Sequence, residues 1–142
     1  MSRPTHARLT ASGVVLRVHQ AGSGPVVLLL HGFPDSSELW RDVTPRLVAA
    51  GFRVIAPDLR GFGQSDAPAA VGDYALGHIV ADLRTLIGRL AGDEPVRVIG
   101  HDWGAVAGWC LALEHPQLVR SQVALSVGHP RQYAVAGLEQ KL

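Results

Sequence analysis

The pentapeptide Gly100-His101-Asp102-Trp103-Gly104 has residue types and a spacing suited to covalent chemistry. A carboxylate with glycines two residues before and two residues after it is the pattern of a nucleophile elbow, a tight turn between a strand and a helix. Glycine is required at both ends because the turn crowds those positions and a Cβ there would clash. The start of the following helix favours an ionised carboxylate and offers free backbone N–H groups. The pattern therefore predicts that Asp102 is a nucleophile.

A simpler interpretation of the pentapeptide remains open. In it, Asp102 only caps a helix, and Trp103 is a large core residue beside the turn. His31 and His101 lie at the carboxyl ends of expected strands, where a general base could lie, but we interpret both as structural residues that shape the neighbouring loops. The elements and motifs around the pentapeptide decide between these interpretations.

The surrounding elements predict an α/β protein with a mostly parallel sheet and helices on both faces. Short apolar runs alternate with stretches of helical periodicity, which is typical of this class. The active site of such a sheet lies beyond the carboxyl ends of its strands, and the pentapeptide is at one of these ends. The expected strands cover residues 7–10, 14–19, 26–30, 52–56, 96–99 and 121–126, the first two as a hairpin, and two of the expected helices cover 76–90 and 103–113.

A further helix is expected between the third and fourth of these strands. Ser36 or Ser37 can cap it, and Gly51 ends it. The apolar residues between them recur at helical spacing, although Pro45 is unfavourable inside a helix. These apolar residues are Leu39, Trp40, Val43, Leu47 and Val48.

Two more motifs follow expected strands, and together with the pentapeptide they resemble a known family. His31-Gly32-Phe33-Pro34 follows the strand at 26–30, and the glycine-rich segment Asp58–Ser65 follows the next strand. These motifs, in this order, resemble the α/β-hydrolase superfamily, and within it the epoxide hydrolases and their haloalkane dehalogenase relatives. The resemblance covers about residues 14–127 and implies the α/β-hydrolase fold.

The resemblance also implies a reaction and its residues. Asp102 would attack a carbon of an epoxide and form a covalent ester, which water activated by a histidine would hydrolyse to a diol. By the same resemblance, the backbone N–H groups of Phe33 and Trp103 would form the oxyanion hole. No cofactor is implied. The residues expected to shape the site are His31, Gly32, Pro34, Gly100, His101 and Gly104.

Part of this machinery is not expected in the chain. In the family, the triad acid and the base histidine follow the nucleophile along the chain. The stretch Ser126–Pro130, where many dehalogenases carry the acid, has no Asp or Glu, and His129 is at best a weak substitute for the base. We expect residues 1–126 to be the N-terminal part of the hydrolase core and residues 127–142 to be the start of a truncated cap region. The chain is therefore expected to be inactive or limited to a half-reaction.

Two alternatives stay open, a runner-up from the same superfamily and a hypothesis from another class. The first is a haloalkane dehalogenase, although Phe33 favours an epoxide hydrolase because dehalogenases usually have a halide-binding amide side chain at that position. The second is a non-catalytic chain that dimerises, aggregates or binds a partner through an exposed sheet edge, because an edge strand presents unpaired backbone groups.

Composition restricts the remaining function classes. Hydrophobic residues make up 47% and charged residues 18% of the chain, which indicates a globular protein. The formal net charge of +1 and the lack of a basic stripe argue against nucleic acid or membrane partners. Cys110 is the only cysteine, and no ligand-spaced cluster predicts a metal. We therefore expect a cytoplasmic protein, and the resemblance implies a small-molecule epoxide or haloalkane as its substrate.

Overall fold

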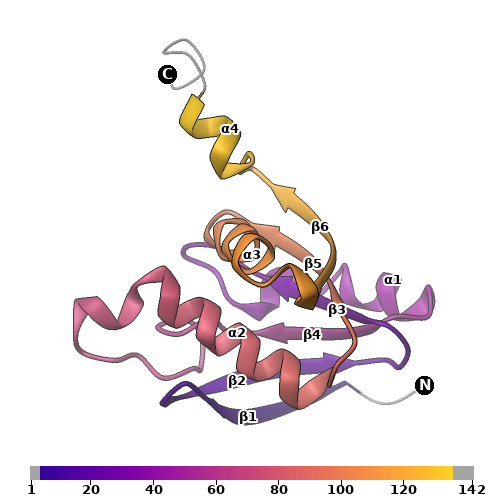
Figure 1. The fold of residues 1–142 in the computed structure, drawn as a ribbon. Coiled ribbons are helices and arrows are strands. Elements are labelled where there is room, and N and C mark those ends of the chain that lie inside the picture. Colours follow the sequence, from indigo (N-terminus) through magenta and orange to yellow (C-terminus); the bar gives the residue numbers. More distant parts are fainter. Residues whose placement is uncertain (1–3, 136–142) are drawn as a thin grey trace.

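The computed structural model describes residues 4–135, which form a six-stranded sheet with helices on both faces (Figure 1). The strand order is β1-β2-β4-β3-β5-β6. The first two strands form an antiparallel hairpin, β2 pairs antiparallel with β4, and the remaining pairs are parallel. The strands are β1 Thr5–Ala11, β2 Val14–Ala21, β3 Val26–Leu30, β4 Arg53–Pro57, β5 Val96–His101 and β6 Val119–Leu125. The expected mostly parallel α/β sheet is confirmed.

The helices divide between the two faces of the sheet. The longer helices α2 and α3 pack on one face, while η1 and α1 cover β3 and β4 on the other. Helix α4 continues beyond β6 and projects away from the sheet (Figure 1). The α-helices are α1 Thr44–Ala49, α2 Leu76–Leu90, α3 Trp103–Glu114 and α4 Pro130–Val135, and the 3-10 helices are η1 Ser37–Trp40, η2 Val71–Tyr74 and η3 Pro116–Leu118.

The central strand β3 explains why its sequence is apolar throughout. Leu28 and Leu30 pack in the core under α2 and α3, and Val27 and Leu29 pack in the core under η1 and α1. Successive side chains of a strand point to opposite faces, and both faces of β3 are covered, so all five of its residues are buried. This burial fixes β3, and with it the loop that follows Leu30, in the middle of the sheet.

The expected continuous helix between β3 and β4 is wrong. The structure has η1 at Ser37–Trp40 and, after a turn, the short helix α1 at Thr44–Ala49. Pro45 lies in the first turn of α1, where its missing N–H costs nothing, so it begins a helix rather than interrupting one. Ser36 caps η1 by accepting a hydrogen bond from the Glu38 N–H at 3.3 Å. Gly51 ends the segment as expected, with a φ of +85°.

The sheet has two edge strands, β1 and β6, and β6 carries exposed apolar side chains. Its residues Val123 and Leu125 are 51% and 42% exposed. Val123 and Leu125 pair in register with Ile99 and His101 of β5. They lie on the face of the sheet where η1 and α1 pack, but these helices pack against β3 and β4. Among the described residues β6 is thus an edge strand with a partly bare apolar face. The expected boundary between a core at 1–126 and a cap region at 127–142 stays a prediction, since residues 136–142 lie outside the described part.

No helix within residues 4–135 has the length and apolar character that a membrane span requires.

Candidate active site

Asp102 sits on a sharp turn between β5 and α3. Its φ of 54° and ψ of −123° are rarely adopted by a residue with a side chain, so the backbone there is strained. Gly100 and Gly104 must be glycines because neighbouring backbone atoms leave no space for a Cβ at either position. A Cβ on Gly100 would lie 2.6 Å from the Gly104 carbonyl oxygen, and a Cβ on Gly104 would lie 2.2 Å from the Leu30 oxygen. The structure therefore has the geometry expected of a nucleophile elbow.

The loop after β3 brings backbone up to the Asp102 side chain. The Phe33 N–H donates a hydrogen bond to Asp102 Oδ1 at 2.9 Å. Gly32 permits this approach, since a Cβ there would lie 2.4 Å from the Asp102 Cβ. The loop closes with a hydrogen bond from the Asp35 N–H to the Gly32 carbonyl oxygen at 2.9 Å, and the Phe33-Pro34 peptide is cis. Residues 69 positions apart in the sequence thus meet at one carboxylate.

Hydrogen bonds keep the Asp102 carboxylate ionised. The Phe33 N–H, and next the Trp103 N–H, lower the pKa of Asp102 below its ordinary value, and nearby His101 lowers it further. The side chain is only partly covered, so its desolvation opposes these effects weakly. A carboxylate that is ionised at neutral pH can attack carbon without a general base.

His31 is a fully buried connector between two loops. Its Nε2 accepts a hydrogen bond from the Leu59 N–H at 2.9 Å, and its Nδ1 lies 2.9 Å from the Gly32 carbonyl oxygen. Because the first partner can only donate and the second can only accept, the ring carries its proton on Nδ1. Burial lowers the pKa of His31 and keeps the ring neutral. With both nitrogens engaged, this imidazole orients the loop and has no free nitrogen to act as a base.

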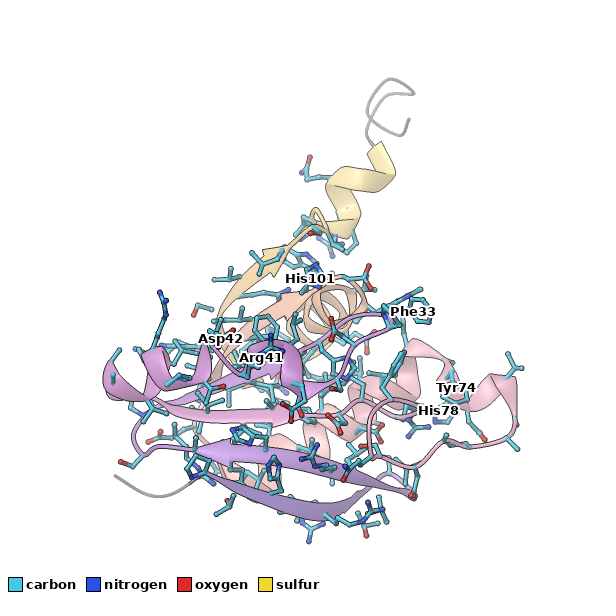
Figure 2. The ribbon with its side chains drawn as sticks, turned by 180° about the vertical axis from the view of Figure 1, so that it is seen from behind. Phe33, Arg41, Asp42, Tyr74, His78 and His101 are labelled. Carbon is cyan, nitrogen blue, oxygen red and sulfur yellow. The ribbon has the colours of Figure 1, made fainter. Side chains whose placement is uncertain are left out.

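His101 lies beside Asp102 but makes no hydrogen bond to it. Its Nδ1 is buried and has no hydrogen-bond partner among the described residues. The side chain belongs to the last residue of β5, in register with Leu125 of β6 (Figure 2). Its effect on the carboxylate is therefore electrostatic.

Asp58, at the start of the glycine-rich segment, joins two loops through its buried carboxylate. Oδ1 accepts from the Ser37 N–H at 2.8 Å, and Oδ2 accepts from the Gln64 N–H at 3.0 Å. Burial alone would raise the pKa of Asp58, but these N–H groups and the Arg17 guanidinium, 3.6 Å away, lower it. The glycine-rich segment, which is the loop after β4, is thus joined to the loop after β3.

Sequence analysis missed the buried ion pair between Arg60 and Asp82. Arg60 Nε lies 2.7 Å from Asp82 Oδ2, and Nη2 lies 2.8 Å from Oδ1. A further bond runs from Nη1 to the Asp73 carbonyl oxygen at 2.6 Å. The pair ties the glycine-rich segment to α2. The signal in the sequence was an aspartate on the otherwise apolar stripe of α2.

The His129 side chain is engaged with residues other than Asp102. Its ring contacts Trp109 edge to face, with ring centroids 4.6 Å apart, and its Nδ1 accepts a bond from the Arg131 N–H at 3.2 Å. Trp109 follows Asp102 by seven residues on α3, which places it about 10 Å further along the helix. His129 is therefore poorly placed to replace a base. Within residues 4–135, no group of three or more His, Cys, Asp or Glu side chains could hold a metal ion.

Comparisons with known proteins agree with the fold. A family model described as the alpha/beta hydrolase fold matches residues 25–139. Epoxide hydrolase 3 of Siraitia grosvenorii is 41% identical over 98% of this chain and 44% of its own length. Epoxide hydrolase A of Mycobacterium tuberculosis is 43% identical over 89% of this chain and 40% of its own length.

Solved structures of epoxide hydrolases have the same fold. The Vigna radiata enzyme called VrEH1 superposes with a TM-score of 0.85 at 40% identity, covering 87% of this chain and 38% of that protein. A mutant of potato epoxide hydrolase superposes with a TM-score of 0.88 at 31% identity, covering 98% of this chain and 44% of that protein. The chain thus spans less than half the length of these relatives. It belongs to the α/β-hydrolase fold family, with epoxide hydrolases among its relatives at about 40% identity.

Proposed function

We propose that this protein is an epoxide hydrolase-like enzyme in which Asp102 opens the epoxide ring. The observation that carries the proposal is the ionised Asp102 carboxylate on the elbow, with the Phe33 N–H 2.9 Å from Oδ1. Oδ1 is held by this donor, so the other carboxylate oxygen is the one free to attack. A new C–O bond forms to the epoxide carbon while the ring C–O bond breaks. The ring oxygen keeps the electron pair and takes up a proton, giving a hydroxyalkyl ester of Asp102.

The same donors suit the second step. Water adds to the ester carbonyl, and negative charge develops on the oxygen that faces the Phe33 and Trp103 N–H groups. One such oxyanion donor accelerates reactions of this kind by roughly a hundred- to a thousandfold. Among residues 4–135 no imidazole is hydrogen-bonded to Asp102, and the rings of His31 and His129 are engaged with other groups. We therefore infer that this chain forms the ester and hydrolyses it slowly, a half-reaction.

The names of the relatives support an epoxide as substrate. One observation of the structure bears on each of the two alternatives. A haloalkane dehalogenase would use the same carboxylate, but Phe33 places a ring, and no amide side chain, at the mouth of the site. A non-catalytic chain that pairs through β6 fits the exposure of Val123 and Leu125. Both alternatives are outcomes of the following experiment.

The test is intact-mass spectrometry after incubation with styrene oxide or a bromoalkane. We expect one styrene oxide adduct, mapped by peptide sequencing to Asp102 and absent from Asp102→Asn. Asp93→Asn, which removes an exposed carboxylate, is the matched control and should keep the adduct. Reaction with the bromoalkane alone would favour the dehalogenase. A folded chain that reacts with neither reagent would contradict the proposed chemistry and favour the non-catalytic alternative.

A further inference from the structure

Two histidines face each other across the β1–β2 hairpin. His6 of the edge strand β1 is the direct register partner of His19 of β2 (Figure 1). Directly opposite residues of an antiparallel pair project from the same face of the sheet. This is the face opposite to α2, because the neighbouring Val18 is buried in the core with that helix. The spacing of the two residues in the sequence predicted no metal site, since it does not show which residues face each other across a hairpin.

The two rings have the spacing of two ligands on one metal ion. Their centroids are 4.9 Å apart, and their planes are inclined by 50°. A first-row metal ion lies about 2.0–2.1 Å from an imidazole nitrogen, and angles of roughly 90–110° between two such bonds place the ring centroids about 4.5–5.2 Å apart. The separation of the His6 and His19 rings therefore suits one shared ion.

Both rings can offer a nitrogen lone pair. Arg17 Nη2 lies 3.3 Å from His6 Nε2, and because a guanidinium can only donate, this Nε2 carries no proton. Its lone pair thus accepts only one long hydrogen bond on the exposed side of the hairpin. The half-buried His19 ring has no hydrogen bond to any of residues 4–135. Imidazole nitrogens of this kind are ligands for Zn²⁺, Ni²⁺ and Cu²⁺.

The charges around the pair allow a cation to bind. Arg17 is the adjacent positive charge, but its Nη1 lies 3.6 Å from Asp58 Oδ2 and 4.0 Å from Glu38 Oε1. Arg17 can therefore release His6 and keep both carboxylates as partners. Glu38 also interacts electrostatically with His19, which favours positive charge there. No third protein ligand joins the two histidines within the described residues, so water would complete the coordination.

We propose that His6 and His19 bind a divalent transition metal ion of the class Zn²⁺, Ni²⁺ or Cu²⁺, and that this ion joins the edge strand β1 to β2. The inference does not depend on the proposed function, since it involves none of the residues assigned to the reaction. Strand β1 pairs only with β2. Elements at the border of a structure open locally at a lower free energy than its core does. An ion that binds only the paired strands opposes this opening.

Calorimetric titration of the untagged chain with ZnCl₂ tests the site. We expect one Zn²⁺ per chain. Binding should be at least about tenfold weaker in His6→Gln and in His19→Gln, because the second imidazole of the pair acts at a high effective concentration. The matched control is His78→Gln, an equal change at an exposed position of α2, which should bind Zn²⁺ as the wild type does. Glu38→Gln removes the adjacent negative charge and should weaken binding, by less than the loss of a ligand.

Amide hydrogen exchange tests whether the ion joins the strands. Zn²⁺ should slow the exchange of Thr5–Ala11 in the wild type and in His78→Gln, and should leave it unchanged in His6→Gln. A wild type that binds no Zn²⁺ would overturn the site. Binding that persists unchanged in either histidine variant would also overturn it, because the ion would then be held elsewhere on the surface. Zn²⁺ that binds to the pair without protecting β1 would refute the joining of the strands.

Discussion

The two sides of the elbow differ in how firmly they are tied to the rest of the molecule. Before the elbow, the loops after β3 and β4, residues 31–37 and 58–66, are joined by buried polar contacts. After it, β6 is an edge strand with exposed apolar side chains, and α4 projects away from the sheet (Figure 1). The first region donates to the Asp102 side chain through the Phe33 N–H, whereas the second contacts only its backbone, since the Asp102 N–H donates to the Leu125 carbonyl oxygen at 3.2 Å.

This difference bears on the reaction proposed above. Buried hydrogen bonds and ion pairs hold His31, Asp58 and Arg60 in one arrangement, so the donor at Phe33 is in place before any substrate binds. Preorganised donors of this kind are what a developing negative charge requires. Under the proposed function, the donors for ester formation are therefore organised within the described residues, and no described side chain next to β6 is hydrogen-bonded to the Asp102 carboxylate.

The largest expected effect on stability comes from breaking the buried pair that ties the glycine-rich segment to α2. Arg60→Met leaves Asp82 buried without its cation, and we expect a loss of about 3–5 kcal/mol in the free energy of unfolding. Chemical denaturation measures this loss. The matched control is Arg8→Met in the exposed pair with Asp66, which should cost at most about 1 kcal/mol.

A double variant sharpens this prediction. Adding Asp82→Leu to Arg60→Met removes the uncompensated charge and should restore much of the stability. If Arg60→Met alone costs no more than Arg8→Met, the pair does not hold the loop, and the contrast between the two regions loses its main support.

His31→Phe should have the next largest effect. The substitution keeps a ring of similar shape but leaves the Leu59 N–H and the Gly32 carbonyl oxygen without partners, at about 1–3 kcal/mol for each buried group. Ester formation at Asp102 should slow as well, because Gly32 precedes the Phe33 donor. Thermal denaturation and adduct rates test the two effects. Full stability with full reactivity would show that the loop is held by other contacts.

The same histidine predicts a pH dependence. Folding lowers the pKa of His31 from 6.5, so the unfolded chain binds this proton more readily. The stability it contributes is complete above pH 6.5 and is lost as the pH falls through that value toward the lower pKa of the folded state. The wild type should therefore lose more stability than His31→Phe between about pH 8 and pH 5, where the reference imidazole gains its charge. The pKa of His19 is also lowered, so His19→Phe is measured to correct for its contribution. If stability falls with pH equally steeply in the wild type and in His31→Phe, the pH dependence does not come from His31.

A smaller loss of stability is expected at the elbow. Gly104→Ala places a methyl group 2.2 Å from the Leu30 carbonyl oxygen and forces β3 and α3 apart, at about 1–3 kcal/mol. Gly88→Ala in α2 has open space and should stabilise the helix by up to about 1 kcal/mol. Denaturation midpoints of the two variants should thus shift in opposite directions. A tolerated Gly104→Ala would mean that the elbow is looser than its contacts indicate.

The sequence allowed much of this arrangement to be predicted where local pattern and burial agree. The run Val26–Leu30 had to be a central strand because it is apolar on both faces, and the spacing of Gly100 and Gly104 predicted the turn at Asp102. The helix predicted across Pro45 failed, since proline at the first turn and proline inside a helix look alike in an apolar periodic stretch. Only the structure separates the two cases.

Contacts between distant residues were beyond sequence analysis. Arg60 and Asp82 are 22 positions apart, and an aspartate on an apolar stripe does not name its partner. The position of His129 was also unpredictable, because it depends on how the chain leaves β6 and packs against Trp109. The roles of Asp102, Phe33 and Trp103 in catalysis remain predictions that the geometry supports.

The smallest expected effect lies on the other side of the comparison, at β6. Val123→Lys replaces an exposed side chain, and we expect the free energy of unfolding to change by less than about 0.5 kcal/mol. Val98→Lys in β5, the buried register partner of Gln122, should unfold the protein and is the contrasting control. If Val123→Lys instead lowers stability strongly, and does so only at high protein concentration, β6 is covered by a second copy in solution. The exposed edge would then be an interface, because a charged side chain on an edge strand blocks edge-to-edge pairing.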